Sequence, residues 1–166
     1  MKNKTLWLMV GFLFMLGFLF IGLMAAQRAY PQSRAHRATT ITVYADYNCQ
    51  CCSEWIKYMK RHGFHVNRMN LNRDQLQDFK NKIGVPTRLR SCHTALAGKY
   101  AIEGHIPVEY ISALLASNSE IAGITLPGMP DGSPGMEHPG GHKEKLLVYW
   151  FSKDGKSALW TPAKVN

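Results

Sequence analysis

The cysteines of this chain are concentrated at one point, and that point constrains the fold more than any other feature. Three of the four cysteines lie within residues 49–52, which read Cys-Gln-Cys-Cys, and the fourth is Cys92. Thiolates this close together can exchange disulfides, hold a soft metal ion or form a strained vicinal pair. A β-branched segment, 40–45, precedes the tetrapeptide, and apolar residues at helical spacing follow it over 53–62. The pattern therefore predicts that the cysteines lie at a strand-to-helix turn.

The alternation of strands and helices continues beyond this turn. A second helix is predicted to begin at Asn72, because Gln75 follows three residues later in a capping-box arrangement. Trp55 and Phe79 are predicted core residues. The predicted order is strand, helix, strand, helix, strand, strand, helix, over 40–45, 53–62, 64–71, 72–83, 94–97, 100–103 and from Pro107 onward. Gly98 and Lys99 separate the two consecutive strands, which predicts a short hairpin with a glycine-first turn.

This order resembles the thioredoxin fold over roughly residues 40–117. The resemblance implies an α/β domain in which the loop before the third strand faces the cysteine turn. Cys92 occupies that approach to the third strand, so the resemblance also implies that all four sulfur atoms meet in space.

The last part of the chain has a different pattern. Proline and glycine recur throughout 126–142, so this segment is predicted to be irregular. It contains Met129, Met136, His138 and His142. Two further segments, 146–151 and 157–161, predict an extra C-terminal hairpin.

The first residues predict contact with a membrane. Lys2 and Lys4 precede an uncharged apolar run over 5–26, and about 20 apolar residues can span a bilayer, whereas a signal peptide has roughly 7 to 15. The length favours an uncleaved anchor, with a cleaved signal peptide as the alternative. We expect three regions: an N-terminal transmembrane or signal segment at 1–27, a linker at 28–39 and one domain at 40–166. Export of that domain would place its cysteines in an oxidising space.

The net charge of +9 raises the question of nucleic-acid binding. The basic residues are interspersed with polar and apolar ones, and no recognition motif or basic-aromatic platform accompanies them. We therefore expect a solvated basic surface near anionic headgroups and no nucleic-acid partner.

The cysteine spacing leaves several chemistries open. Cys49 and Cys52 have the C-x-x-C spacing of a redox pair, but Cys51 and Cys92 would compete in any disulfide exchange. Zinc prefers tetrahedral sites, to which two adjacent cysteines contribute poorly. Copper(I) is soft, accepts two or three thiolates and tolerates thiolates that bridge neighbouring ions. Copper therefore ranks above an iron–sulfur cluster, which needs four thiolates at more open spacing, and above two structural disulfides.

Four motifs together resemble the CopG-type copper-resistance proteins, a thioredoxin-like metal-binding family of Gram-negative envelopes. They occupy residues 49–52, 91–95, 103–107 and 126–136. The resemblance implies that the chain binds copper in the periplasm for copper resistance, with a redox role between Cu(I) and Cu(II). It also implies exchange with a copper exporter or a periplasmic copper chaperone. The anchor predicts tethering to the inner membrane.

The predicted metal ligands are Cys49, Cys51, Cys52 and Cys92, with His93, Met129 and Met136 as additional candidates. They would hold more than one ion, chiefly Cu(I), and no organic cofactor or catalytic residue is predicted. His105 is predicted to be a capping or packing residue. His138 and His142 are predicted to lie in a solvated loop, with binding of Cu(II) as the alternative. The alternative function is an envelope thiol-disulfide oxidoreductase that uses Cys49 and Cys52. A third possibility combines copper binding with redox chemistry: copper held by the cysteines changes oxidation state, and the protein acts as a copper oxidase or reductase.

Overall fold

The structure is a computed structural model that describes residues 39–161. The predicted membrane segment and nearly all of the predicted linker lie outside these residues. Within the described range, no helix is both long and apolar enough to cross a bilayer.

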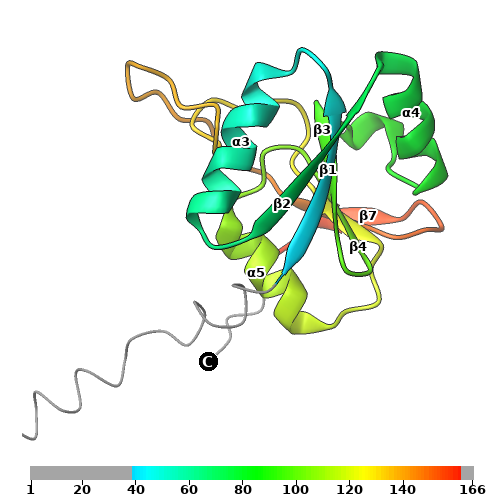
Figure 1. Cartoon of the computed structure of the whole chain (residues 1–166). Coiled ribbons are helices and arrows are strands. Elements are labelled where there is room, and N and C mark those ends of the chain that lie inside the picture. The colour runs from blue at the N-terminus through cyan, green and yellow to red at the C-terminus, as the bar shows by residue number, and fades with distance from the viewer. Residues whose placement is uncertain (1–38, 162–166) are drawn as a thin grey trace, which may run out of the picture. The chain divides into compact units, whose positions relative to one another are not determined.

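The described residues form one mixed α/β unit around a seven-stranded sheet (Figure 1). The strand order is β2-β1-β3-β4-β5-β6-β7. Strand β1 pairs parallel with β2 and antiparallel with β3, and β3 pairs antiparallel with β4. In chain order, the elements are β1 (Thr40–Asp46), α3 (Gln50–Arg61), β2 (His65–Leu71), α4 (Arg73–Lys82), a 3-10 turn (Thr87–Leu89), β3 (His93–Ala97), β4 (Tyr100–Glu103), α5 (Val108–Ser117), β5 (Gly123–Thr125), β6 (Tyr149–Phe151) and β7 (Ser157–Leu159).

Local signals explain where several of these elements begin and end. Helix α4 has the predicted capping box, in which the Asn72 side chain accepts from the Gln75 amide and the Gln75 side chain accepts from the Asn72 amide. Helix α5 begins directly after Pro107. The hairpin between β3 and β4 turns at Gly98, whose φ is +58°. These three predictions are confirmed.

The helices cover both faces of the sheet. Helix α3 packs Trp55 and Met59 into the main core, together with Ile111 and Leu114 of α5. Tyr44 of β1 points to the opposite face, because neighbouring side chains in a strand alternate, and there it stacks on Phe79 of α4 at 4.0 Å between ring centroids. In Figure 1, α3 and α5 therefore lie on one side of the sheet and α4 on the other.

Two details differ from the sequence predictions, whereas a third prediction is confirmed. Phe79 is half-buried, whereas the adjacent Lys80 is completely buried. The short strand β5 was not predicted, because three residues of strand are too few for a pattern. The predicted C-terminal hairpin is confirmed as β6 and β7, which extend the sheet through β5.

Candidate metal centre

The four cysteines lie together at the N-terminal end of α3. Cys49 is the N-cap residue, and its sulfur accepts a hydrogen bond from the Cys52 amide at 3.3 Å. The Cys51 sulfur lies 3.5 Å from that of Cys49 and 3.9 Å from that of Cys92. The sulfur of Cys92, the residue directly before β3, lies 3.6 Å from that of Cys52. The topology thus brings the distant fourth cysteine to the other three, as predicted.

The cysteines are present in two oxidation states. Cys49 and Cys52 form a disulfide, whereas Cys51 and Cys92 are free thiols. Disulfide sulfurs are not thiolates, and the thiolate is the form that binds metal. This oxidised form therefore offers two thiols, and reduction of the disulfide would give four.

His105 extends the site with a nitrogen donor. Its Nε2 lies 3.1 Å from the Cys92 sulfur, and its Nδ1 lies 2.8 Å from the Pro134 carbonyl oxygen. A carbonyl can only accept, so Nδ1 carries the proton and donates it, which leaves a lone pair on Nε2. The Cys92 thiol is then the donor to that lone pair. The sequence suggested capping or packing for His105, whereas the structure places it beside the fourth cysteine.

Gly104 explains how His105 reaches Cys92. The residue has a φ of +83°, and a Cβ placed on it would lie 2.6 Å from the Leu126 carbonyl oxygen and 2.7 Å from the Ser91 Cβ. Three chain segments meet here, with no space for a methyl group. The motif at 103–107 was the only sequence signal that pointed to His105. The proximity of His105 to Cys92 depends on the close contact between these three segments, which the sequence does not reveal.

His93 is completely buried and incompletely bonded. Its Nδ1 lies 3.3 Å from the Cys92 sulfur, and its ring packs against Trp55 with 4.6 Å between ring centroids. Its Nε2 has no hydrogen-bond partner among the described residues. A buried nitrogen without a partner is energetically unfavourable and needs an explanation, and a metal ion bound there would provide one.

The surroundings keep these groups uncharged at neutral pH. Burial lowers the pKa of His93 to well below its ordinary value, and the nearby His105 acts in the same direction. Burial also lowers the pKa of His105. For Cys92, burial and then the neighbouring Cys51 raise the pKa to about 12. A cation that binds here therefore meets neutral imidazoles and must displace the thiol proton.

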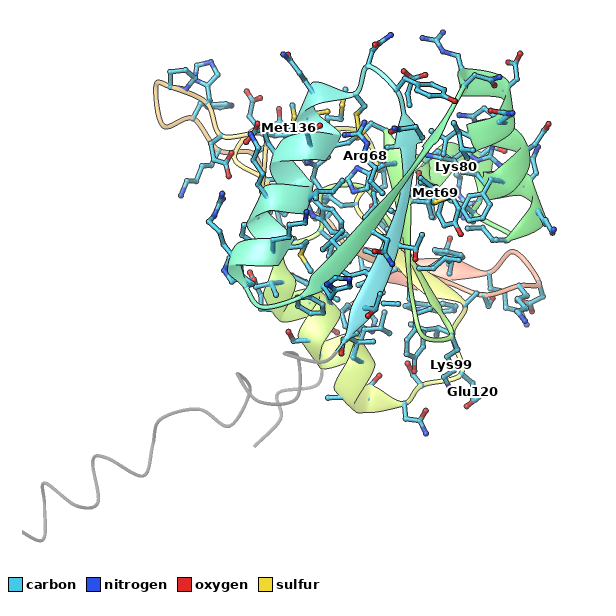
Figure 2. All side chains as sticks on the ribbon, in the orientation of Figure 1. Arg68, Met69, Lys80, Lys99, Glu120 and Met136 are labelled. Carbon is cyan, nitrogen blue, oxygen red and sulfur yellow. A yellow bond between two sulfur atoms is a disulfide. The ribbon has the colours of Figure 1, made fainter. Side chains whose placement is uncertain are left out.

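The two predicted methionines have different positions. The Met129 sulfur lies 3.9 Å from that of Cys51, and its side chain is half exposed. Met136 is half-buried beside α3 (Figure 2), and among residues 39–161 no sulfur contact joins it to a cysteine. The structure therefore brings Met129, but not Met136, to the thiol group.

The irregular segment that carries both methionines is fixed to the site. The Ser91 hydroxyl donates to the Gly128 carbonyl, and Pro134 accepts from His105. A Cβ on Gly135 would lie 2.7 Å from the Trp55 amide nitrogen, so the chain passes directly over the first turns of α3. Lack of regular secondary structure does not make this segment independent of the centre.

A buried ion pair holds the residue before Cys92. Lys80 Nζ lies 2.6 Å from a Glu103 carboxylate oxygen, and neither side chain is exposed. Lys80 also donates to the Ser91 carbonyl at 2.6 Å, while the Ser91 amide donates to Glu103 at 2.7 Å and the Thr94 hydroxyl donates to its other oxygen. Burial raises the pKa of Glu103, and its three partners oppose that shift. Both backbone polar groups of Ser91 are thus fixed by charged side chains.

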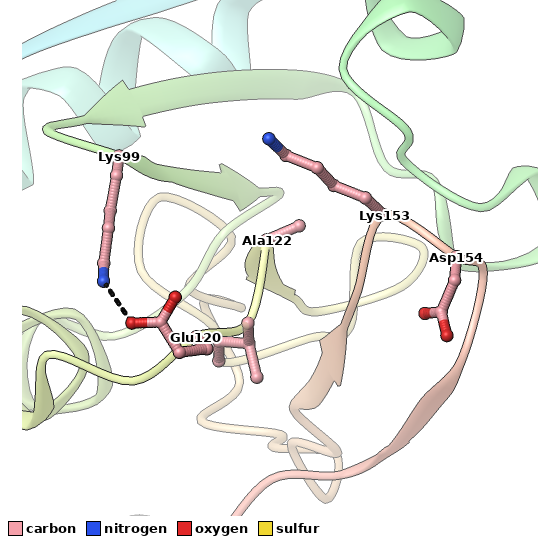
Figure 3. A pocket seen from close by; sticks show the side chains of 6 residues that line it. Lys99, Glu120, Ala122, Lys153 and Asp154 are labelled. Carbon is pink, nitrogen blue, oxygen red and sulfur yellow. Dashed lines mark hydrogen bonds and ion pairs between the residues drawn. The ribbon is translucent and has the colours of Figure 1, made fainter.

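Two cavities differ in their relation to the cysteines. One, of about 240 Å³, is lined in part by two of the four cysteines. Its lining consists of Asp46, Cys49, Arg73, Leu76, Gln77, Ser91 and Cys92. The other, of about 420 Å³, has no cysteine or histidine in its lining and includes the Lys99–Glu120 ion pair (Figure 3). Figure 2 shows Lys99 and Glu120 at the opposite end of the described residues from Met136. The donor chemistry is therefore at the first cavity.

Comparisons with known proteins give one matching family model and two similar solved structures. The family model DUF411, described as a protein of unknown function, matches residues 89–136, which include Cys92, His93 and His105. No curated protein matches the chain. Two solved structures of the copper resistance protein CopG are similar to it. Form 1 is 34% identical with a TM-score of 0.66, covering 72% of this chain and 93% of that one. Form 2 is 35% identical with a TM-score of 0.66, covering 73% and 94%.

Proposed function

The chain belongs to the family of the copper resistance protein CopG, and we propose that it binds copper as cargo, holding Cu(I) through Cys49, Cys51, Cys52 and Cys92. The observation that carries the proposal is the convergence of four sulfur atoms around Cys92. Thiolates are soft donors and select Cu(I) over harder cations. The centre would serve copper resistance by sequestering the ion.

The arrangement of donors favours more than one copper ion. Cys92 belongs to two groups whose donor atoms all lie within 4.8 Å of one another, namely the four cysteines and the set Cys92, His93 and His105. A thiolate shared by two groups can bridge two ions. We therefore propose that Cys92 is the bridging ligand and that the two imidazoles complete the coordination of an ion on its inner side. Met129 is a further soft donor on the exposed side.

An anaerobic titration with Cu(I) tests the proposal. The fully reduced chain competes with a chromophoric Cu(I) chelator, and the stoichiometry is read from the chelator absorbance. We expect at least two ions per chain, with the largest loss of binding in Cys92→Ser because both donor groups share that sulfur. Ser53→Ala, on the same helix turn, is the matched control. Unchanged stoichiometry in both Cys51→Ser and Cys92→Ser would contradict the proposal.

A second function is favoured by a separate observation, the disulfide between Cys49 and Cys52. These residues have the spacing and the helix N-terminal position of a thiol-disulfide exchange pair. A thioredoxin-like fold would suit either function, and it is supported by the β2-β1-β3-β4 order and by helices on both faces. Metal-free insulin reduction distinguishes the two, because a copper-binding protein without exchange activity gives no turnover.

We also propose that the domain faces the periplasm, attached through the N-terminal apolar segment, and exchanges copper with an exporter or chaperone there. The disulfide supports an oxidising compartment. Fractionation of cells, combined with a protease-accessibility assay on spheroplasts, tests this location.

A further inference from the structure

We propose a second metal site on this chain, formed by Asp131, His142 and Glu144 and suited to Cu(II). One donor atom from each residue lies within 4.8 Å of the other two. Metal–ligand bonds of about 2 Å put two donors at most about 4 Å apart, so small rotations of these side chains would close the site. None of the four cysteines takes part, and the site is therefore independent of the proposed Cu(I) centre.

The site is built from two segments that the backbone holds side by side. The Glu144 amide donates to the Asp131 carbonyl at 2.9 Å, and the Gly132 amide donates to the Met136 carbonyl at 2.8 Å. Gly132 has a φ of +79°, and a Cβ on it would lie 2.6 Å from the Lys143 Cγ. Such close contact brings Asp131 against His142 and Glu144, although they are more than ten residues apart in the sequence.

The chemistry of the donors selects the ion. Carboxylate oxygens and an imidazole nitrogen are harder ligands than thiolates, so they favour a divalent ion over Cu(I). Among first-row divalent metals, such donors bind Cu(II) most tightly. Two carboxylates would also balance its charge. His142 and Glu144 are exposed and Asp131 is half-buried, so the ion can enter from solvent without rearrangement of the core.

His138 is a neighbour that the site does not use. Its Nδ1 accepts from the Gly140 amide at 3.1 Å, which places the proton of the neutral ring on Nε2. Its ring centroid lies 6.3 Å from that of His142. A change at His138 therefore alters the same exposed segment without removing a proposed ligand.

One ligand of the second site is close in the sequence to the thiol centre. Asp131 is two residues from Met129, whose sulfur contacts Cys51. Successive Cα atoms are 3.8 Å apart, so the Cα atoms of residues 129 and 131 lie within about 8 Å. One short segment thus carries a soft donor that contacts Cys51 and, two residues later, one of the harder donors of the second site.

The experiment adds Cu(II) to the full chain in which Cys51 and Cys92 are both replaced by serine. The disulfide then holds the two remaining cysteines, so no free thiol reduces the metal. We expect one ion with an axial electron paramagnetic resonance spectrum that shows coupling to one nitrogen. Loss of a residue that merely orients a ligand weakens metal binding by about tenfold or more, so His142→Ala and Glu144→Gln should each raise the Kd by at least about tenfold. His138→Ala should leave it unchanged.

A second measurement covers the case in which the double cysteine variant misfolds. In the oxidised chain with its sequence unchanged and the Cys51 and Cys92 thiols blocked by alkylation, sub-stoichiometric Cu(II) should broaden the amide signals of Gly132 and Glu144 before those of residues around His62 and His65, two exposed histidines elsewhere. The inference is overturned if His142→Ala binds Cu(II) as tightly as the parent chain, or if His138→Ala weakens binding equally. Broadening that begins at the other histidines would also overturn it.

Discussion

Two buried polar pairs lie on either side of Cys92, and they differ in how completely they are bonded. The Lys80–Glu103 ion pair has several partners, including both polar backbone groups of Ser91. In the His93 and His105 pair, one nitrogen has no partner among the described residues and another meets only a thiol. A satisfied network holds its surroundings in place, whereas an unsatisfied pair leaves donor atoms available for a ligand. We infer that the ion pair positions Cys92 and that the two histidines bind copper together with Cys92.

Removal of one partner of the ion pair should give the largest effect. Lys80→Met leaves Glu103 buried without a counter-charge, and such changes destabilise proteins by about 3–5 kcal/mol. We expect a loss of this size in the free energy of unfolding, measured by urea denaturation of the metal-free chain.

An exposed pair provides the matched control for that prediction. Lys57 and Glu54 are equally close at 2.7 Å but are largely exposed, so Lys57→Met should cost less than about 1 kcal/mol. Similar losses in the two variants would remove the contrast between a positioning pair and an ordinary surface contact. The double variant Lys80→Met, Glu103→Leu should recover much of the lost stability, because it leaves no unpaired charge.

The histidine pair should show the opposite relation between stability and binding. His93→Phe removes a buried nitrogen that lacks a partner, and an unsatisfied group of this kind costs about 1–3 kcal/mol. We expect the metal-free variant to be at least as stable as the parent chain, while its Cu(I) affinity falls. Paired thermal unfolding and Cu(I) competition measurements test both parts, and a variant that loses stability without losing copper would indicate a packing role instead.

The pH dependence of stability should sharpen the same contrast. The pKa of His93 is lowered by burial, so below an unfolded-state value of about 6.5 the unfolded chain binds a proton that the folded chain does not. The contribution of neutral His93 to the free energy of unfolding is therefore fully present above about pH 6.5. It is lost as the pH falls below that value, at up to about 1.4 kcal/mol per pH unit. Urea denaturation of the metal-free chain between pH 7 and pH 5 should show this loss, and His93→Phe should show a shallower slope.

Met129 should give the smallest effect. Its sulfur contacts Cys51, but the side chain is half exposed and Met129→Leu preserves most of its volume. We expect a change in stability within about 0.5 kcal/mol and a modest decrease in Cu(I) affinity, measured by chelator competition. Met69→Leu, at another half-exposed methionine, is the control and should leave affinity unchanged. A loss as large as that in Cys92→Ser would make Met129 a principal ligand.

The predictable parts of this molecule were those with local signals. The capping box at Asn72 and the glycine turn at Gly98 each depend on residues close in sequence, and both were found where expected. The approach of Cys92 to the tetrapeptide was implied by the resemblance of the predicted element order to the thioredoxin fold, and the sulfur contacts of Cys92 agree with it. His105 and Lys80 were missed for a common reason. A lysine in a helix is usually exposed, and a histidine before a helix usually caps or packs, so only tertiary contacts reveal their roles.

Gly104 has a consequence for how genetic data on this protein should be interpreted. The residue has no donor atom, yet it lies where Ser91 and Leu126 approach too closely for any side chain. A substitution there would push apart the segments that carry Cys92, His105 and the loop over them. In a survey of variants scored by copper tolerance, Gly104 would therefore resemble a ligand, and sensitivity to substitution alone would overcount the residues that touch the metal.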